Sequence, residues 1–190
     1  MRTLRSLVAL AALAACAPTT RQTTSAPDVA GTTTIIVVRH AEKATEPAAD
    51  PPLTAAGTAR AEALVDAVRG MPVTAIVSTD FARTRSTAAP LAARLGITPE
   101  IVDARARDHA RLVAAGLLSR HRGETVVVVG HSNTVPDIVA ALGATKPPPI
   151  CDAEYDNLYV VRVPVTGAAS VERRKYGAAS AEEGSCRAMK

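Results

Sequence analysis

Two histidines in this chain of 190 residues each follow an apolar run that is typical of a buried strand. His40 comes after the β-branched residues 35–38 and one arginine, and His131 comes after the valine-rich residues 125–129 and one glycine. Either histidine alone would be read more simply as a surface or capping residue. The carboxyl ends of strands in an open α/β sheet line a ligand crevice, so the repeated pattern predicts that the two imidazoles meet there.

Two arginines accompany the histidines and supply positive charge. Arg39 directly precedes His40, and Arg83 follows residues 78–80, which offer caps for the start of a helix. A helix start favours anions, and a guanidinium can bond two oxygens of one phosphate while staying charged. Together with His131, these residues would form a binding pocket for a tetrahedral dianion.

Strands and helices are expected to alternate along the rest of the chain. The patterns predict strands near residues 35–38, 73–77, 97–102, 125–129, 158–163 and 169–174, and helices near 55–69, 83–95, 105–120 and 135–142. The β-branched runs are typical of strands buried on both faces. The predicted fold is therefore α/β, a three-layer sandwich with a mostly parallel central sheet flanked by helices.

The order of the motifs resembles the histidine phosphatase superfamily, which includes the cofactor-dependent phosphoglycerate mutases. The matching segments are Arg39-His40-Ala41 with Glu42-Lys43, Leu53-Thr54-Ala55-Ala56-Gly57, Ser78 with Arg83, Thr87 and Ala88, and Gly130-His131. This pattern selects Arg83 rather than Arg85 as the second arginine. The resemblance spans residues 35–176 and implies a phosphoglycerate mutase-like fold.

The resemblance also implies a mechanism. A neutral His40 nitrogen would attack phosphorus in line and form a phosphohistidine, which water then hydrolyses. Arg39, Arg83 and His131 would bind the substrate and stabilise the phosphoryl oxygens during transfer. Neither a metal ion nor another cofactor is expected.

The sequence departs from the mutase pattern at the proton donor for the leaving group. The glutamate segment that the mutase pattern has after the second arginine is absent. Asp108 ranks first as the acid, although a carboxylate at a helix start is ordinary. Asn133 is a second candidate for substrate binding, with helix capping as the simpler reading. The other acidic candidates are Asp103, Glu42, Asp152, Glu154 and Asp156.

The first residues resemble an export signal. Residues 1–15 combine early arginines with a short apolar stretch, and Leu13-Ala14-Ala15-Cys16 resembles the bacterial lipoprotein signal, in which the cysteine is lipidated. The alternative is an ordinary cleaved leader. We expect residues 16–32 to be a lipidated cysteine and flexible tether, 33–178 the histidine phosphatase domain and 179–190 a tail. The protein is expected to be exported and lipid-anchored to the periplasmic or cell-surface side of a bacterial membrane.

Export would place the remaining cysteines, Cys151 and Cys186, in an oxidising compartment where they can form a disulfide. The alternative is two unrelated thiols. Composition argues against a nucleic-acid partner, because aromatic residues make up only 2% of the chain and two of the arginines behind the formal charge of +4 lie in the leader.

These observations predict a metal-independent phosphatase that hydrolyses phosphomonoesters or phosphohistidine, with a small phosphorylated substrate or a phosphoprotein as its partner. An exported phosphate-binding module without turnover is the alternative. A mutase fits poorly because export would separate it from glycolytic substrates. A divalent metal held by His40, His131 and a carboxylate such as Asp108 is disfavoured, because the two arginines would repel the cation.

Overall fold

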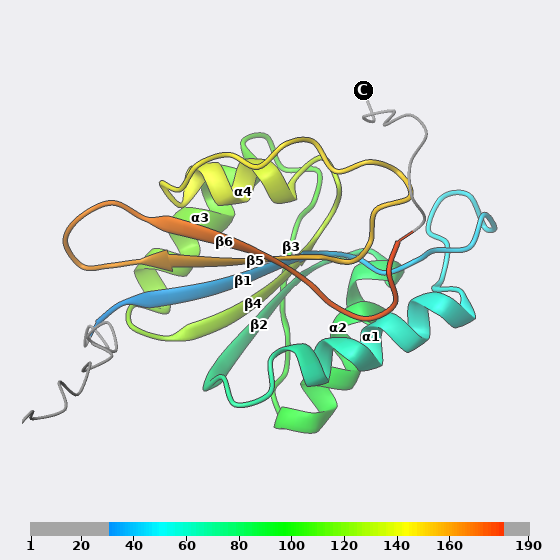
Figure 1. Ribbon diagram of the computed structural model, residues 1–190. Coiled ribbons are helices and arrows are strands. Elements are labelled where there is room, and N and C mark those ends of the chain that lie inside the picture. Colours follow the sequence, from blue (N-terminus) through cyan, green and yellow to red (C-terminus); the bar gives the residue numbers. More distant parts are fainter. Residues whose placement is uncertain (1–30, 181–190) are drawn as a thin grey trace, which may run out of the picture.

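A computed structural model describes residues 31–180 and shows alternating strands and helices (Figure 1). The strands are β1 (Thr33–Arg39), β2 (Val73–Thr79), β3 (Glu100–Val102), β4 (Thr125–Gly130), β5 (Asn157–Val163) and β6 (Ser170–Lys175). The helices are α1 (Ala55–Ala67), α2 (Ala82–Leu95), α3 (His109–Arg120) and α4 (Val135–Ala141).

The strands form one sheet in the order β3-β2-β4-β1-β5-β6. The pairs β2–β3, β2–β4 and β1–β4 are parallel, whereas β5 and β6 run antiparallel at one side. The predicted α/β fold with a mostly parallel sheet is therefore confirmed. In the β1–β4 ladder Arg39 lies opposite Gly130, so the residues that follow the two strands, His40 and His131, lie side by side at the carboxyl edge of the sheet.

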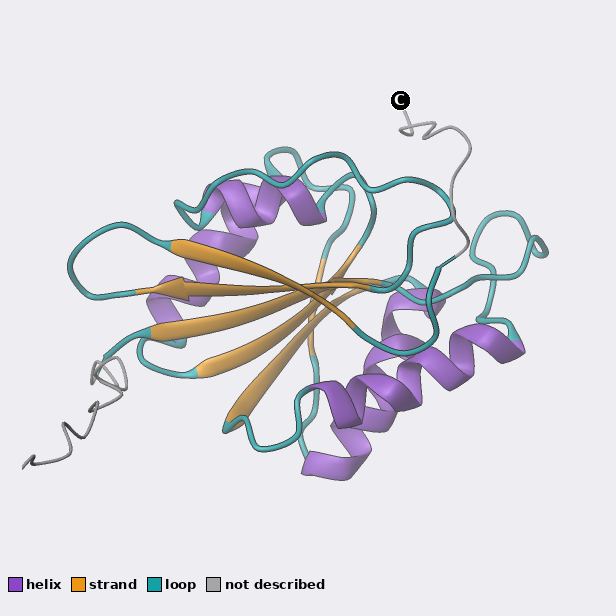
Figure 2. Ribbon diagram, in the orientation of Figure 1, coloured by secondary structure: helices purple, strands orange, loops and turns teal. Residues whose placement is uncertain are grey.

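Helices cover both faces of the sheet, with α1 and α2 on one side and α3 and α4 on the other (Figure 2). Successive side chains of a strand point to opposite faces. Accordingly, Ile35 and Val37 pack into the core beneath α3 and α4, whereas Ile36 and Val38 pack into the core beneath α1 and α2. All four are 0% exposed, which fixes β1 between two apolar layers.

Two predicted boundaries were wrong. The helix expected from residue 105 begins only at His109, because Asp108 adopts a left-handed backbone (φ 61°) that a right-handed helix does not continue through. The strand expected over residues 97–102 is limited to Glu100–Val102, because only these residues pair with β2.

The expected leader, Cys16 and most of the tether lie outside the described residues, as does Cys186. Within residues 31–180, none of the helices has both the length and the hydrophobicity needed to cross a bilayer.

Helix α1 lies unusually close to the segment that follows β1. The carbonyl oxygen of Glu42 accepts a hydrogen bond from the Thr54 amide at 2.9 Å, and a Cβ added at Gly57 would lie 2.1 Å from that oxygen. The Glu42 carboxylate in turn accepts hydrogen bonds from Arg60, which is 3% exposed. Glycine at position 57 therefore allows α1 to hold the chain just beyond His40.

Gly57→Ala should lower the free energy of unfolding by about 1–3 kcal/mol, because the new methyl group collides with backbone. Gly116→Ala is the matched control inside α3. Its added Cβ would meet only the flexible guanidinium of Arg120 at 2.9 Å. The control should be neutral or stabilising by up to about 1 kcal/mol, as alanine favours helix. Urea denaturation of both variants measures the difference, and equal effects would contradict the close-approach argument.

Candidate functional site

The carboxyl ends of β1 and β4 bring His40 and His131 together. Their ring centroids are 5.4 Å apart with an interplanar angle of 66°, and the His40 amide donates to the Gly130 carbonyl at 2.9 Å. The residues are 3% and 7% exposed. The two strand ends therefore form one buried site, as the repeated sequence pattern predicts.

The hydrogen bonding of His40 defines its tautomer. Nδ1 lies 2.8 Å from the carbonyl oxygen of Ala41. A carbonyl only accepts, so Nδ1 carries the proton and Nε2 keeps its lone pair. Burial lowers the pKa of His40 from 6.5 to about 3, and the charge of Arg39 acts in the same direction. At neutral pH, His40 is an uncharged imidazole with Nε2 available as a nucleophile.

Thr87 ties this histidine to α2. Its hydroxyl accepts from the Ala41 amide at 2.9 Å and donates to the Arg83 carbonyl at 2.7 Å. Ala41, whose carbonyl holds the His40 ring, is thereby fixed from a residue 46 positions away. The sequence pattern included Thr87 without indicating this role.

Arg39 is held by the segment that precedes β5. Its Nη1 donates to the carbonyls of Cys151, Asp152 and Glu154 at 2.8, 3.0 and 2.9 Å. The guanidinium carbon also lies 4.1 Å from the ring centroid of Tyr155, a cation–π contact. These contacts orient the guanidinium from one edge and one face.

Arg83 is held in a similar way from the opposite side. Its Nη1 lies 3.6 Å from the Asp50 carboxylate, and its guanidinium carbon lies 4.0 Å from the Phe81 ring centroid. Asp50 also accepts from the amide of Ala82, the first residue of α2, at 3.0 Å. The prediction that residues 78–80 cap this helix was wrong: the first two belong to β2, and Asp50 reaches the helix start from a distant loop.

Both arginines share one unusual feature. Their Nε atoms are buried, and among the described residues neither has a hydrogen-bond partner. A buried donor left unpaired costs about 1–3 kcal/mol, so two such donors beside the histidines favour a ligand that brings acceptor oxygens. A tetrahedral oxyanion such as phosphate has this chemistry.

His131 completes the group. Its Nε2 lies 3.0 Å from the Thr79 hydroxyl, and Phe81 packs edge-on against its ring at 5.3 Å between centroids. Burial lowers the pKa of His131 from 6.5 to about 4, with a smaller contribution from the charge of Arg83. Like His40, it is neutral at physiological pH.

Asp108 and Asn133 are not drawn into contact with this group. Both are exposed, and they line a shallow hollow between the starts of α3 and α4 with His109, Thr134 and Asp137. In the described part of the chain, neither makes a hydrogen bond or an ion pair with the two histidines or the two arginines. The acid role of Asp108 and the substrate role of Asn133 therefore stay predictions.

Most of the other acidic candidates have partners elsewhere. Glu42 pairs with Arg60, Asp156 with Lys175, and Glu154 accepts from the Cys151 amide. Asp103 accepts from the Arg105 amide at 2.8 Å. Two carboxylates that the sequence analysis did not single out as acids also lie near site residues: Asp50 beside Arg83, and Asp80, whose charge raises the pKa of His131.

Cys151 connects the site to the predicted disulfide. It is 5% exposed and disulfide-bonded, and its carbonyl is one of the three that hold Arg39. Its expected partner, Cys186, lies outside the described residues, so that pairing stays a prediction. The segment is also tied to residue 180, whose hydroxyl accepts from the Tyr155 amide at 2.8 Å.

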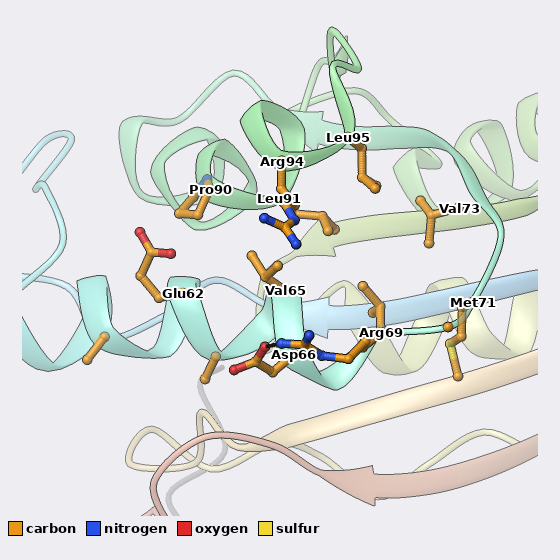
Figure 3. Close-up of a pocket in the computed structure, with 14 residues that line it drawn as sticks. Glu62, Val65, Asp66, Arg69, Met71, Val73, Pro90, Leu91, Arg94 and Leu95 are labelled. Carbon is orange, nitrogen blue, oxygen red and sulfur yellow. Dashed lines mark hydrogen bonds and ion pairs between the residues drawn. The ribbon is translucent and has the colours of Figure 1, made fainter.

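A larger hollow of about 650 Å³ lies elsewhere, between the ends of α1 and α2 (Figure 3). Val65, Leu91 and Met71 give it apolar walls, and the ion pair of Asp66 with Arg69 lies at its rim. None of the four site residues lines it. Within residues 31–180, no group of three or more His, Cys, Asp or Glu side chains is arranged to hold a metal ion.

Comparisons with known proteins agree with this geometry. Residues 35–108 match the family model of the histidine phosphatase superfamily (branch 1). A search of curated proteins found no match.

Several solved structures share the fold. The protein histidine phosphatase SixA complexed with tungstate aligns with a TM-score of 0.62 at 18% identity, over 75% of this chain and 96% of that one. A candidate phosphohistidine phosphatase SixA from Nakamurella multipartitia aligns with a TM-score of 0.54 at 26% identity, over 81% and 100%. A mycobacterial glucosyl-3-phosphoglycerate phosphatase aligns with a TM-score of 0.59 at 15% identity, over 78% and 100%.

The two histidines should make the fold sensitive to mild acid. Their pKa values are lowered in the folded state, so below about pH 6.5 the unfolded chain binds more protons than the folded one. The free energy of unfolding therefore decreases as the pH is lowered. Each histidine should lower the free energy of unfolding by roughly 1–2 kcal/mol between neutral pH and about pH 5, which is above the range where most carboxylates titrate. Urea denaturation in phosphate-free buffer across this range measures the slope. His40→Asn should make it shallower, and an unchanged slope would contradict the assignment.

Proposed function

We propose that this chain is a phosphatase of the histidine phosphatase superfamily and that it works through a phosphohistidine intermediate on His40. The observation that carries the proposal is the pair of buried Nε donors of Arg39 and Arg83, which have no hydrogen-bond partner among the described residues, together with a neutral His40. An incoming phosphoryl group satisfies both donors and meets the free lone pair of Nε2.

The reaction follows from these positions. Nε2 of His40 attacks phosphorus, a P–N bond forms, and the bond to the leaving group breaks opposite it. The arginines and His131 bind the non-bridging oxygens, where positioned charge favours transfer. A water molecule then attacks phosphorus, the P–N bond breaks, and inorganic phosphate and neutral His40 are regenerated.

The leaving group is proposed to be one that departs without a strong protein acid. No carboxylate in the described residues hydrogen-bonds to His40 or His131. A phosphohistidine protonated by solvent on its other ring nitrogen releases neutral imidazole (conjugate acid pKa about 6.5), and an aryl phosphate releases a phenolate (about 10). Both leaving groups are far weaker bases than alkoxides and need no proton from a protein acid as they leave. This chemistry favours phosphohistidine on a protein, or an aryl phosphate, over an alkyl phosphomonoester.

The central experiment is to trap the intermediate. Purified protein is mixed with a phosphohistidine peptide, an aryl phosphate and an alkyl phosphate, then quenched in alkali and mapped for acid-labile phosphate. We expect the label on His40 and rates that fall from the first substrate to the last. His40→Asn should lose activity by roughly 10³-fold or more, as for removal of a nucleophile.

His121→Asn is the matched control, since His121 pairs with Glu100 and Glu124 rather than with site residues. It should keep its activity. Undiminished turnover after exhaustive chelation is expected for a metal-independent reaction. Equal phosphate release by His40→Asn and the parent would overturn the mechanism, and phosphate binding by a parent that never turns over would favour the anchored binding module.

We also propose that the protein is exported and held at a bacterial membrane through lipid on Cys16. The sequence Leu13-Ala14-Ala15-Cys16 supports this proposal. Cys16→Ala should move the protein from the membrane fraction to the soluble fraction when expressed with its leader in a bacterium. Cys151→Ala is the control and should leave the membrane share of the folded protein unchanged; an unaltered distribution of Cys16→Ala would exclude the anchor.

A further inference from the structure

Two buried hydroxyls connect His131 to backbone. Thr79, the last residue of β2, is 1% exposed, and its Oγ1 lies 3.0 Å from Nε2 of His131 and 2.8 Å from Oγ1 of Thr84. The Thr84 hydroxyl, which is 0% exposed, lies 2.8 Å from the carbonyl oxygen of Phe81 and 3.2 Å from that of Thr79. The three side chains therefore form one hydrogen-bonded chain that ends at carbonyl groups.

The carbonyl groups fix the direction of this chain. A carbonyl oxygen only accepts, so the single proton of the Thr84 hydroxyl is donated to backbone. The Thr79 hydroxyl must then donate its own proton to Thr84, and only its lone pairs remain for the ring. Nε2 of His131 therefore carries a hydrogen and donates to Thr79. Because neutral imidazole has one N–H, Nδ1 of His131 is a bare acceptor.

The bare nitrogen is also the accessible one. Unlike the Nε atoms of Arg39 and Arg83, Nδ1 of His131 is not fully buried, and within residues 31–180 it has no hydrogen-bond partner. The oxygens of a phosphoryl dianion also act as acceptors. Two acceptors that meet without a proton repel each other, and the hydrogen bonds of Thr79 and Thr84 keep the ring proton on Nε2. Contact between Nδ1 and a phosphoryl oxygen therefore needs a further proton.

We propose that each phosphoryl group is bound together with one proton, which lies between Nδ1 of His131 and a phosphoryl oxygen. The proton comes from solvent when the arriving group is a dianion, and it arrives on the phosphoryl oxygen when the group is a monoanion. The inference rests on the proposed function and deepens it, because it assigns the protonation state in which the substrate is bound. Thr79 and Thr84 are positioning residues, since they act through His131.

The surroundings of His131 explain why the proton arrives with the ligand. The titratable and charged groups that face this ring are Arg39 and His40 at the end of β1, Asp80 after β2, Arg83 on α2 and His109 at the start of α3. Burial, followed by the charge of Arg83, lowers the pKa of His131 to about 4 against the opposing charge of Asp80, so the ring is neutral in the empty site. A bound dianion offsets the arginine charges and favours a protonated ring.

Calorimetric titration with inorganic phosphate, in two buffers of different ionisation enthalpy, counts the protons taken up. At about pH 8 free phosphate is mainly the dianion, so the parent should take up close to one proton for each phosphate bound. By linkage, Kd should rise roughly tenfold from about pH 7.5 to about pH 8.5. His40→Asn should keep the uptake, whereas His131→Asn should lose it, because only the second variant removes the proposed proton carrier.

Thr84→Val is the sharpest variant, because it changes a residue that does not touch the ring. Valine keeps the shape but removes the acceptor of the Thr79 hydroxyl, which can then donate to Nε2. Neutral His131 would then hold its proton on Nδ1, and the uptake should fall toward zero. Thr84→Ser restores the hydroxyl and should restore the uptake. Thr74→Val, on the same strand but bonded to Glu124, should match the parent.

The outcomes separate this proposal from the proposed function. If the parent hydrolyses an aryl phosphate but binds phosphate without proton uptake, the proton site is wrong although the phosphohistidine mechanism stands. Loss of the uptake in His40→Asn, or an unchanged uptake in Thr84→Val, would also overturn the proton site. If the parent hydrolyses nothing but takes up one proton that Thr84→Val abolishes, the proton site stands and the catalytic mechanism fails. A parent that binds no phosphate overturns both.

Discussion

The parallel pairing of β1 with β4 is the constraint on which the site depends. Because Arg39 lies opposite Gly130, the next residue of each strand, a histidine in both cases, leaves the sheet at the same level. The apolar residues of both strands are packed between two helical layers, so a shift in register would break this packing and draw the polar residues at the strand ends toward the apolar layers. The free energy of core packing therefore holds the 5.4 Å separation of the two rings.

The cost of burying the two arginines at this site is offset by contacts to one part of each guanidinium group, while another part has no contact. Nη1 of Arg39 donates to backbone carbonyls and Nη1 of Arg83 lies 3.6 Å from the Asp50 carboxylate, while within residues 31–180 both Nε atoms have no hydrogen-bond partner. The chain has one Phe and three Tyr, and two of these four, Phe81 and Tyr155, stack on these guanidinium groups. Scarce aromatic side chains thus serve the site as well as the core.

The loops after the strands are anchored by hydroxyls and by close backbone contact rather than by further charges. Thr87 fixes Ala41, and Gly57 lets α1 approach the Glu42 carbonyl, so the segment after His40 is held from two helices. The Thr79 hydroxyl, at the end of β2, lies 3.0 Å from Nε2 of His131. Three elements distant in sequence therefore orient two imidazoles, which is the arrangement that phosphoryl transfer by positioning requires.

The sequence by itself determined the α/β class and identified Arg39, His40, Arg83 and His131, because β-branched runs and ordered motifs are local patterns. It misplaced the cap of α2 and missed Asp50, because that carboxylate reaches Ala82 from 32 positions away. Only the tertiary structure decided the partners of Arg39 and the contact of Thr79, because each depends on the distance between segments that no local pattern encodes. It also decided the His40 tautomer, because the neighbouring Ala41 that holds the ring is itself held by Thr87, 46 positions away.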